Sequence, residues 1–214
     1  MKMKIDGLEI KWLGHASFFI EGDKTIYIDP YVLPQGSKKA DIILVTHEHF
    51  DHFDRAKIKE LLKPCTEVII PPGCASGLDC KFKIIRENEI LELGSVKVTA
   101  VPAYNVNKFR MGKIPFHAKG EGFGYILEMN GVRVYHASDT DFVDEMKKLK
   151  VDIALLPIGG KYTMDFEEAA KAANAIKPKV VIPMHYNTLP ETKASPEEFA
   201  RLVHKDIKVV INPQ

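Results

Sequence analysis

Residues 42–52 read Ile42-Ile43-Leu44-Val45-Thr46-His47-Glu48-His49-Phe50-Asp51-His52, an apolar run that leads straight into a cluster of histidines and acids. The apolar run at 42–45 is typical of a short buried strand, and the polar residues fall in the loop that follows it. His47 and His49 are two positions apart, so they share one face of an extended backbone. The strand end is therefore an edge at which several polar side chains can turn toward one point.

The side chains in this loop are of the types that bind transition metals. Imidazole nitrogens together with a carboxylate suit Zn²⁺, Mn²⁺ or Fe²⁺. The alternative is a solvated loop that is rich in histidine by chance. That alternative is disfavoured, because many of the chain's ligand-type side chains fall within one short segment. The stretch predicts a metal site.

The composition is that of an ordinary globular protein. A chain of 214 residues can form one well-buried domain, and we predict a single domain over 1–214. Its 45% hydrophobic and 28% charged residues are typical of soluble proteins. The formal net charge of +1 gives no general attraction to nucleic acid or membranes, so we expect neither as a partner.

No apolar stretch approaches the length of a membrane-spanning helix. Residues 1–6 are charged and lack the apolar core of a signal peptide, which predicts a cytoplasmic protein. Cys65, Cys74 and Cys80 show no Cys-x-x-Cys spacing. We interpret them as small buried or loop residues, with a Cys74–Cys80 disulfide as the alternative.

Strand and helix patterns alternate along the rest of the chain. Strand patterns occur at 8–13, 17–20, 25–28, 42–45, 68–70, 84–85, 96–101, 125–129, 132–135, 153–156, 180–182 and 209–211. Helical spacing occurs at 55–62, 166–176 and 196–204, with Asp165 as an N-cap. Asn130-Gly131 is a strong hairpin signal. Strand groups with helices between them predict an α/β (α+β) fold of two sheets packed face to face and covered by helices.

Two further strand ends carry residues that can bind a metal. Asp139 follows the strand at 132–135, in Tyr135-His136-Ala137-Ser138-Asp139-Thr140, and His185 follows the strand at 180–182. A single strand-end histidine is more often a hydrogen-bonded structural residue. Three strand ends of this kind in one chain favour metal ligation instead.

The order His-x-His-x-Asp-His, then a loop His, then Asp, then His resembles the metallo-β-lactamase superfamily of metal-dependent hydrolases. The resemblance extends from about Leu8 to Asn187. More narrowly, the chain resembles the branch of L-ascorbate 6-phosphate lactonase-like proteins in Trp12-Leu13-Gly14-His15, Ile28-Asp29-Pro30, Tyr135-His136-Ala137-Ser138-Asp139-Thr140 and Pro183-Met184-His185-Tyr186-Asn187. The superfamily resemblance implies a four-layer αββα sandwich with a dinuclear metal site at one edge of its two sheets.

The resemblance also implies which residues bind each ion. The ligands would be His47 and His49 on the first metal, Asp51, His52 and His185 on the second, and Asp139 between them. A carboxylate suits the bridging position because it has two oxygens and a charge that offsets two cations. We expect two divalent ions, Zn²⁺ with Mn²⁺ or Fe²⁺ as alternatives.

The chain departs from the superfamily at the third ligand of the first metal. That histidine usually comes just past a strand, which here is 96–103, and the residue at that point is Asn105. His117 is the only histidine in the loop that follows, before the strand that leads to Asp139. We predict His117 as the ligand, because imidazole binds these cations better than a neutral amide. Asn105 would then support a ligand or face the substrate. Ser138 stands where the superfamily usually has glycine.

Other histidines have less defined roles. His15 and His136 lie in the family-like motifs, which favours support of a ligand or contact with the substrate over plain packing. Asp29 is a candidate for orienting a ligand as well. His204 lies on a late helix beside a lysine and is interpreted as a surface residue.

The predicted metals imply hydrolysis. Two cations about 3.5–4 Å apart lower the pKa of a water held between them and polarise a carbonyl or phosphoryl oxygen. Asp51 would orient the resulting hydroxide by accepting a hydrogen bond. The sequence contains no Gly-x-Ser-x-Gly elbow, Walker loop or dinucleotide fingerprint. We predict a metal-dependent hydrolase that acts on an ester, a lactone or a phosphodiester.

The substrate is less defined by the sequence. Residues 157–163 join a strand to a helix and include Gly159, Gly160 and Lys161, a junction that can present backbone N–H groups to an anion. Lys113 and Lys119 lie near His117. An ordinary turn with solvated lysines is equally compatible. The lactonase-like resemblance favours a phosphorylated small molecule.

Two alternative functions remain. An RNA-processing nuclease of the same superfamily would share the metal ligands, but it would need a substrate-gripping arm or a basic surface. A non-catalytic metal-binding module is the other alternative, because a fold does not fix a function.

Overall fold

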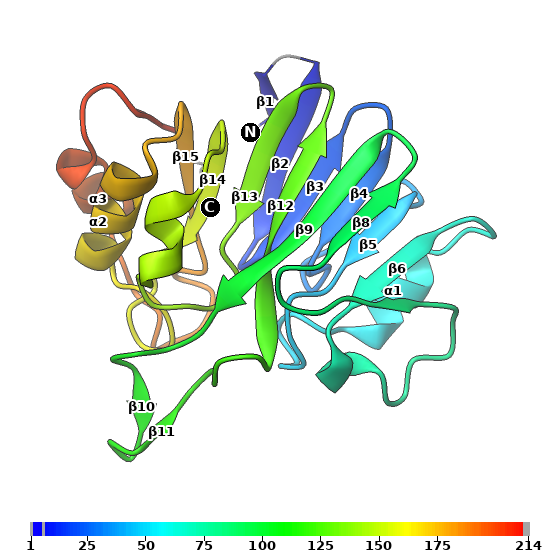
Figure 1. Ribbon diagram of the computed structural model, residues 1–214, viewed down its shortest axis with the longest axis horizontal. Coiled ribbons are helices and arrows are strands. Elements are labelled where there is room, and N and C mark those ends of the chain that lie inside the picture. The colour runs from blue at the N-terminus through cyan, green and yellow to red at the C-terminus, as the bar shows by residue number, and fades with distance from the viewer. Residues whose placement is uncertain (1, 6, 212–214) are drawn as a thin grey trace.

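Two seven-stranded sheets pack face to face in the computed structural model, which describes residues 2–5 and 7–211 (Figure 1). The first sheet contains, in order, β1 (Lys2–Ile5), β2 (Leu8–Gly14), β3 (Ser17–Glu21), β4 (Thr25–Ile28), β5 (Ile42–Leu44), β6 (Glu67–Ile70) and β7 (Lys83–Ile84). The second contains, in order, β16 (Lys208–Val209), β15 (Val180–Met184), β14 (Ile153–Pro157), β13 (Val132–His136), β12 (Gly122–Met129), β9 (Val96–Ala103) and β8 (Ile90–Leu93). A separate hairpin of β10 (Phe109–Arg110) and β11 (Ile114–Pro115) protrudes from the sandwich.

Helices cover the outer faces of both sheets (Figure 1). The helix α1 (Arg55–Leu61) lies over the first sheet, and α2 (Phe166–Ile176) and α3 (Pro196–Leu202) lie over the second; two short 3₁₀ helices are η1 (Pro72–Cys74) and η2 (Asp144–Lys148). Each α-helix begins at a capping side chain that accepts from its first turn: Asp54, Asp165 or Ser195. The predicted αββα sandwich is confirmed, as is the N-cap at Asp165.

Each sheet is half antiparallel and half parallel. Strands β1 to β4 pair antiparallel and β4 to β7 pair parallel. In the second sheet β8, β9, β12 and β13 pair antiparallel, while β13 to β16 pair parallel. Parallel strands end at one common edge, so the loops after β4 and β5 lie together, as do the loops after β13, β14 and β15.

Burial in two apolar cores fixes strand β5, the strand whose end carries the histidine cluster. Ile42 and Leu44 pack into the large apolar core, whereas Ile43 and Val45 pack into a smaller core beneath α1. All four side chains are buried, because a strand that is covered on both faces alternates between two apolar layers. This burial fixes the strand whose end carries the histidine cluster.

The hairpin between β12 and β13 forms where the sequence predicts it. Asn130 and Gly131 have φ values of +55° and +75°, and Met129 pairs with Val132 across them. Positive φ at both central residues is required by the type I′ turn that suits a two-residue hairpin. This hairpin sets the register of β13, which leads to Asp139.

Some element boundaries differ from the prediction. The helix predicted at 196–204 ends at Leu202, because the backbone of Val203 is extended. The final strand is Lys208–Val209 instead of 209–211. Strands β1, β8, β10 and β11 were not predicted. The sequence of β8, Ile90-Leu91-Glu92-Leu93, does not alternate regularly between apolar and polar residues, and its side chains are mostly exposed or half-buried.

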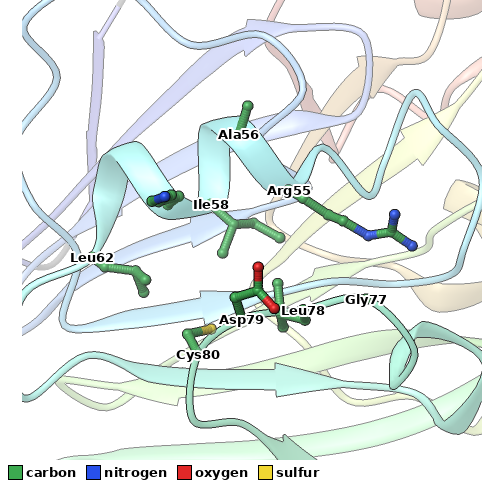
Figure 2. Close-up of a pocket in the computed structure, with 9 residues that line it drawn as sticks. Arg55, Ala56, Ile58, Leu62, Gly77, Leu78, Asp79 and Cys80 are labelled. Carbon is green, nitrogen blue, oxygen red and sulfur yellow. The ribbon is translucent and has the colours of Figure 1, made fainter.

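A small cavity of about 210 Å³ lies between α1 and residues 77–80, away from the histidine cluster (Figure 2). Ile58, Leu78 and Cys80 contribute to its wall. All three cysteines lie among the described residues and carry free thiols, so the Cys74–Cys80 disulfide is not formed. In the described part of the chain, no helix has the length and apolar character needed to cross a bilayer.

Candidate metal centre

The ligand-type residues identified in the sequence meet at one edge of the two sheets. The loop after β5 supplies His47, His49, Asp51 and His52; the loops after β13 and β15 supply Asp139 and His185; and the segment before β12 supplies His117. Except for the half-buried His49, these side chains are buried. Their nitrogens and oxygens form two adjoining groups that share Asp139.

The first group consists of His47, His49 and His117. The Nδ1 atom of His49 lies 3.1 Å from the Nε2 atom of His47 and 3.1 Å from the Nε2 atom of His117. Tetrahedral zinc with bonds of about 2.0–2.1 Å to nitrogen places its ligand atoms roughly 3.3 Å apart. The three nitrogens therefore have the spacing of ligands around one ion. Asp139 Oδ2 is 3.4 Å from His117 Nε2.

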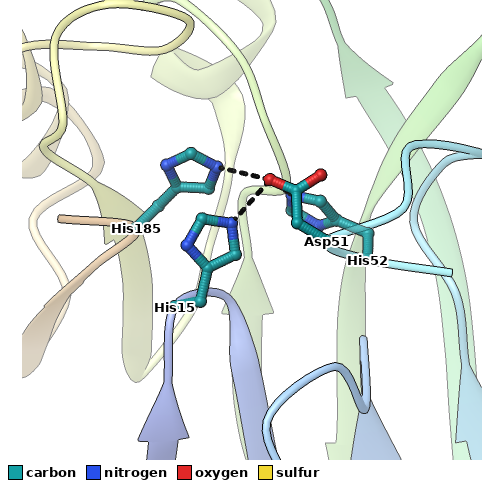
Figure 3. A group of neighbouring side chains, drawn as sticks. All are labelled: His15, Asp51, His52 and His185. Carbon is teal, nitrogen blue, oxygen red and sulfur yellow. Dashed lines mark hydrogen bonds and ion pairs between the residues drawn. The ribbon is translucent and has the colours of Figure 1, made fainter. Parts of the chain in front are cut away.

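The second group consists of Asp51, His52 and His185, with His15 beside them (Figure 3). Asp51 Oδ2 lies 4.0 Å from the Nε2 atoms of both His52 and His185. Asp139 reaches this group as well, because its Oδ1 is 3.4 Å from His52 Nε2 and its Oδ2 is 3.1 Å from His185 Nε2. One carboxylate thus faces both groups, as a bridging ligand must.

Buried polar atoms without partners test whether this arrangement fits a metal. Within residues 2–5 and 7–211, His52 Nε2, His185 Nε2 and Asp139 Oδ1 are buried and make no hydrogen bond. An unpaired buried polar atom costs about 1–3 kcal/mol. A cation between the three atoms would pair all of them at once. The donor set and its burial therefore fit a divalent metal.

The pKa values of the histidines agree with this fit. Burial lowers the pKa of His47 far below its usual value, lowers that of His49, and lowers that of His117 to about 4. These rings are neutral at neutral pH, which metal binding requires. Burial would also lower the pKa of His52, but the carboxylates of Asp139 and Asp29 outweigh it and raise that pKa well above its usual value. His52 therefore sits where a positive charge is favoured.

Asp29 and Thr46 orient two of the rings. His52 Nδ1 donates to Asp29 Oδ2 at 2.7 Å, and the Thr46 backbone N–H donates to Asp29 Oδ1 at 2.8 Å. The Thr46 hydroxyl donates to Asp29 at 2.7 Å and lies 3.0 Å from His47 Nδ1, from which it accepts. This network assigns the Nδ1–H tautomer to both rings and leaves each Nε2 lone pair for a metal. The role expected for Asp29 is thus supported.

Asn105 holds His117 in place. Asn105 Oδ1 accepts from the backbone N–H and from the Nδ1–H of His117, both at 2.8 Å. Its Nδ2 donates to Asp141 Oδ1 at 3.0 Å and to the backbone carbonyl of Tyr162 at 2.9 Å. Since the buried amide is fully engaged, Asn105 does not face the substrate, which was one of the two roles left open for it.

Asp141 was missed by the sequence reasoning. Its buried carboxylate also accepts from the backbone N–H groups of Val106, Asn107 and Lys108 at 2.6–3.2 Å. It therefore anchors the start of the segment that carries His117. The only signal in the sequence was its position two residues after Asp139, in the same strand-end loop.

His15 and His136 support the site in different ways. His15 Nε2 donates to Asp51 Oδ2 at 2.9 Å, and its ring packs against the ring of His185 at a centroid distance of 3.9 Å (Figure 3). His136 Nε2 donates to the Ala16 carbonyl at 2.9 Å, and its Nδ1 accepts from the Ser138 N–H at 3.2 Å. His15 thus positions a ligand directly, whereas His136 shapes the loop that carries Asp139.

The site contains strained backbone. His15, Ser138 and His185 have φ values of +53°, +63° and +53°, in the left-handed region that disfavours most side chains. Such strain clusters at functional sites, where the surrounding structure holds it. It also explains the usual glycine at the position of Ser138. Gly159 is required for a different reason, because a Cβ atom there would lie 2.3 Å from the His185 carbonyl oxygen.

The junction at 157–163 is an ordinary turn and not an anion site. The Gly160 N–H donates to the Met164 carbonyl and the Lys161 N–H donates to the Gly159 carbonyl, each at 3.0 Å. Lys161 is exposed, and Lys119 pairs with Glu145 at 2.9 Å. Neither lysine lines the space above the metal centre. Of the two interpretations that the sequence left open, the structure favours the turn.

A cleft of about 440 Å³ opens above the centre and reaches His49, Asp51, His117 and Asp139. Its other walls are Phe50, Arg110, Phe116, Tyr162, Leu189 and Glu191. The volume is that of a small-molecule site. The walls of the cleft are largely apolar. Their positive charge comes from Arg110, and not from Lys161 or Lys119.

We expect the variants His117→Ala and Asn105→Ala to separate ligation from support. His117→Ala should bind one metal fewer per chain, because the first group then lacks a ligand. Asn105→Ala should still bind the full complement in excess metal, with the affinity of the first ion reduced about 10- to 100-fold. Metal-per-chain analysis and chelator competition measure both. The reverse pattern would assign ligation to Asn105.

Comparison with known proteins agrees with the geometry. Residues 9–185 match the family model described as "Beta-lactamase superfamily domain". The chain is 37% identical to a UPF0173 metal-dependent hydrolase of Pyrococcus abyssi and 39% identical to one of Pyrococcus furiosus, with 95% of this chain and 96% of each relative covered. A solved structure from Parabacteroides distasonis, described as a metal-dependent hydrolase, superimposes with a TM-score of 0.87 at 35% identity over 99% of this chain and 97% of that one.

Proposed function

The chain belongs to the metallo-β-lactamase superfamily and, within it, to the UPF0173 family of metal-dependent hydrolases, and on this premise we propose that it binds two divalent cations and hydrolyses an ester, lactone or phosphodiester bond of a small molecule. The observation that carries the proposal is the position of Asp139. Its carboxylate lies within 3.4 Å of His117 in the first group and of His52 and His185 in the second. That arrangement supports a dinuclear site over a single-ion site.

The proposed ligands are those implied by the sequence: His47, His49 and His117 on one ion, Asp51, His52 and His185 on the other, and Asp139 on both. When bound, two such cations supply a water-derived nucleophile at neutral pH and polarise the bond that is attacked. Zinc is the proposed metal because the donors are imidazole and carboxylate and the first group has tetrahedral spacing.

Asp51 is proposed to orient the nucleophile. Burial would raise the pKa of Asp51, but the hydrogen bond from His15 and the charge of His52 outweigh it and lower that pKa to about 2. Asp51 is therefore ionised at neutral pH and can accept a hydrogen bond. Because His15 fixes the Oδ2 atom of Asp51, the carboxylate is held in one orientation at the floor of the cleft.

The proposed substrate is a small molecule with an anionic group. The cleft has the volume of a small-molecule site, and Arg110 provides a cation on its wall. Among the described residues Arg110 makes no ion pair, and its guanidinium stacks 5.4 Å from the centre of the Phe116 ring. A phosphorylated ester or lactone, as the lactonase-like resemblance implies, would match this wall.

Metal analysis followed by a hydrolase panel tests the proposal. We expect two divalent ions per chain and turnover of at least one ester, lactone or phosphodiester, lost with a chelator and restored by metal. Each phosphorylated substrate is paired with its dephosphorylated form, and the phosphorylated member should be preferred. RNA is included to detect nuclease activity. Full metal occupancy with no turnover of any substrate would favour the non-catalytic module instead.

A further inference from the structure

Tyr162 lies on the wall of the cleft above the metal centre, and its hydroxyl makes no hydrogen bond that supports the described part of the fold. In the part of the chain that the structure describes, the Tyr162 hydroxyl makes no hydrogen bond, whereas the hydroxyls of Tyr27 and Tyr125 donate to backbone carbonyls. A polar group on the wall of a cleft that has no partner within the protein is available to a ligand.

The position of Tyr162 is fixed from two sides. Its backbone carbonyl accepts from Asn105 Nδ2 at 2.9 Å, and the same amide holds His117. Its ring packs edge-on against Phe116, with the ring centres 4.9 Å apart and the planes at 85°. The phenol is therefore held in a defined position relative to a proposed metal ligand.

The surroundings of the Tyr162 phenol favour its protonated form. Burial raises the pKa of the Tyr162 phenol, the negative charges of Glu191 and Asp51 raise it further, and Arg110 opposes them. All three charged residues line the same cleft. The phenol therefore keeps its proton at neutral pH and can act as a hydrogen-bond donor.

Few donors are available in this cleft for the chemistry. Apart from the proposed ligands, Tyr162 and Arg110 are the side chains on its wall that carry a hydrogen-bond donor. Arg110 belongs to the protruding hairpin, whereas Tyr162 is anchored to the network of Asn105 and His117. Hydrolysis develops negative charge on two substrate oxygens, and the cations stabilise the one that they polarise. A hydrogen-bond donor on the cleft wall can stabilise the leaving oxygen as its charge develops.

We propose that Tyr162 is a catalytic residue of this site, whose hydroxyl donates a hydrogen bond to the leaving oxygen of the substrate. The inference rests on the proposed function. The leaving oxygen departs with the electron pair of the bond that breaks and takes its proton from solvent water, whereas the phenol keeps its own proton. The contribution of the hydrogen bond from Tyr162 therefore grows with the negative charge on the leaving oxygen. A fixed donor of this kind is typically worth about 10²-fold or more in kcat.

The variant Tyr162→Phe tests the proposal, since it removes only the hydroxyl. It is compared with the wild type on two esters, or two phosphodiesters, that differ only in a poor leaving group (phenol) or a good one (4-nitrophenol). We expect kcat to fall about 100-fold for the phenyl substrate and less than about 5-fold for the 4-nitrophenyl substrate, with KM and metal content unchanged. Tyr104→Phe is the matched control, because the Tyr104 hydroxyl contacts Glu145 outside the cleft. It should leave both rates unchanged.

The outcomes separate this inference from the proposed function. Three results for Tyr162→Phe would overturn the catalytic role of Tyr162: equal losses of kcat on both substrates, no loss on either, or a loss of metal. Turnover by the wild-type protein would uphold the proposed function in each of these cases. A wild-type protein without chelator-sensitive turnover would overturn both.

Discussion

Replacing Asp139 with asparagine is expected to abolish metal-dependent hydrolysis, with a loss of about 10³-fold or more in kcat/KM. The Asp139 carboxylate faces both histidine groups, so the amide would remove the charge that offsets the two proposed cations and would weaken both proposed sites at once. Burial raises the pKa of Asp139, but the charges of His185 and His52 outweigh it and hold that pKa well below its usual range. The Asp139 carboxylate is therefore ionised in the folded protein at neutral pH.

Metal-per-chain analysis and turnover of the substrate found in the panel measure this effect. Asp144→Asn is the matched control, because Asp144 is an exposed aspartate on η2 that pairs only with Lys147 among the described residues. It should keep full metal content and activity. A variant Asp139→Asn that retained two ions and wild-type turnover would show that the two histidine groups do not share a bridging ligand.

Asp51→Asn and His185→Ala are expected to lose hydrolysis by about 10²- to 10³-fold while the protein stays folded. Both residues belong to the second group, and neither belongs to the apolar cores, which lie between the sheets and beneath the helices. Their loss should therefore change the chemistry far more than the packing. Asparagine at position 51 can still accept from His15, so the loop should keep its conformation.

Circular dichroism and thermal melts test the fold, and turnover of the model substrate tests the activity. His204→Ala serves as the control for a histidine replacement, because the His204 side chain is exposed and its only polar partner within the described residues is the neighbouring Asp206. Wild-type rates in Asp51→Asn or in His185→Ala would contradict the assignment of that residue to the second metal.

The local sequence was sufficient to locate the strand ends that build the site. An apolar run such as Ile42–Val45 is typical of a buried strand, whichever strands lie beside it in the sheet. The polar residues just after it therefore lie at the edge of the sheet. The same argument located Asp139 and His185, and the turn at Asn130-Gly131 fixed the hairpin before Asp139. Resemblance to the superfamily added the order of the ligands, and with it the sandwich.

The cleft walls and the supporting residues were decided only by the tertiary structure. The sequence favoured His117 over Asn105 by ligand chemistry. It did not show that the Asn105 amide, which holds His117, is itself held by Asp141, 36 positions further along the chain. An anion site at the glycine junction, with Lys161 in it and Lys113 and Lys119 near His117, was one of two interpretations of the sequence, yet Arg110 and Tyr162 line the cleft instead. Strand periodicity depends on neighbouring residues, whereas the contacts of a loop side chain depend on which distant loops pack beside it. The sequence therefore determined the edge and its candidate ligands, and the packing of distant loops determined how each candidate ligand is held and what the substrate would meet.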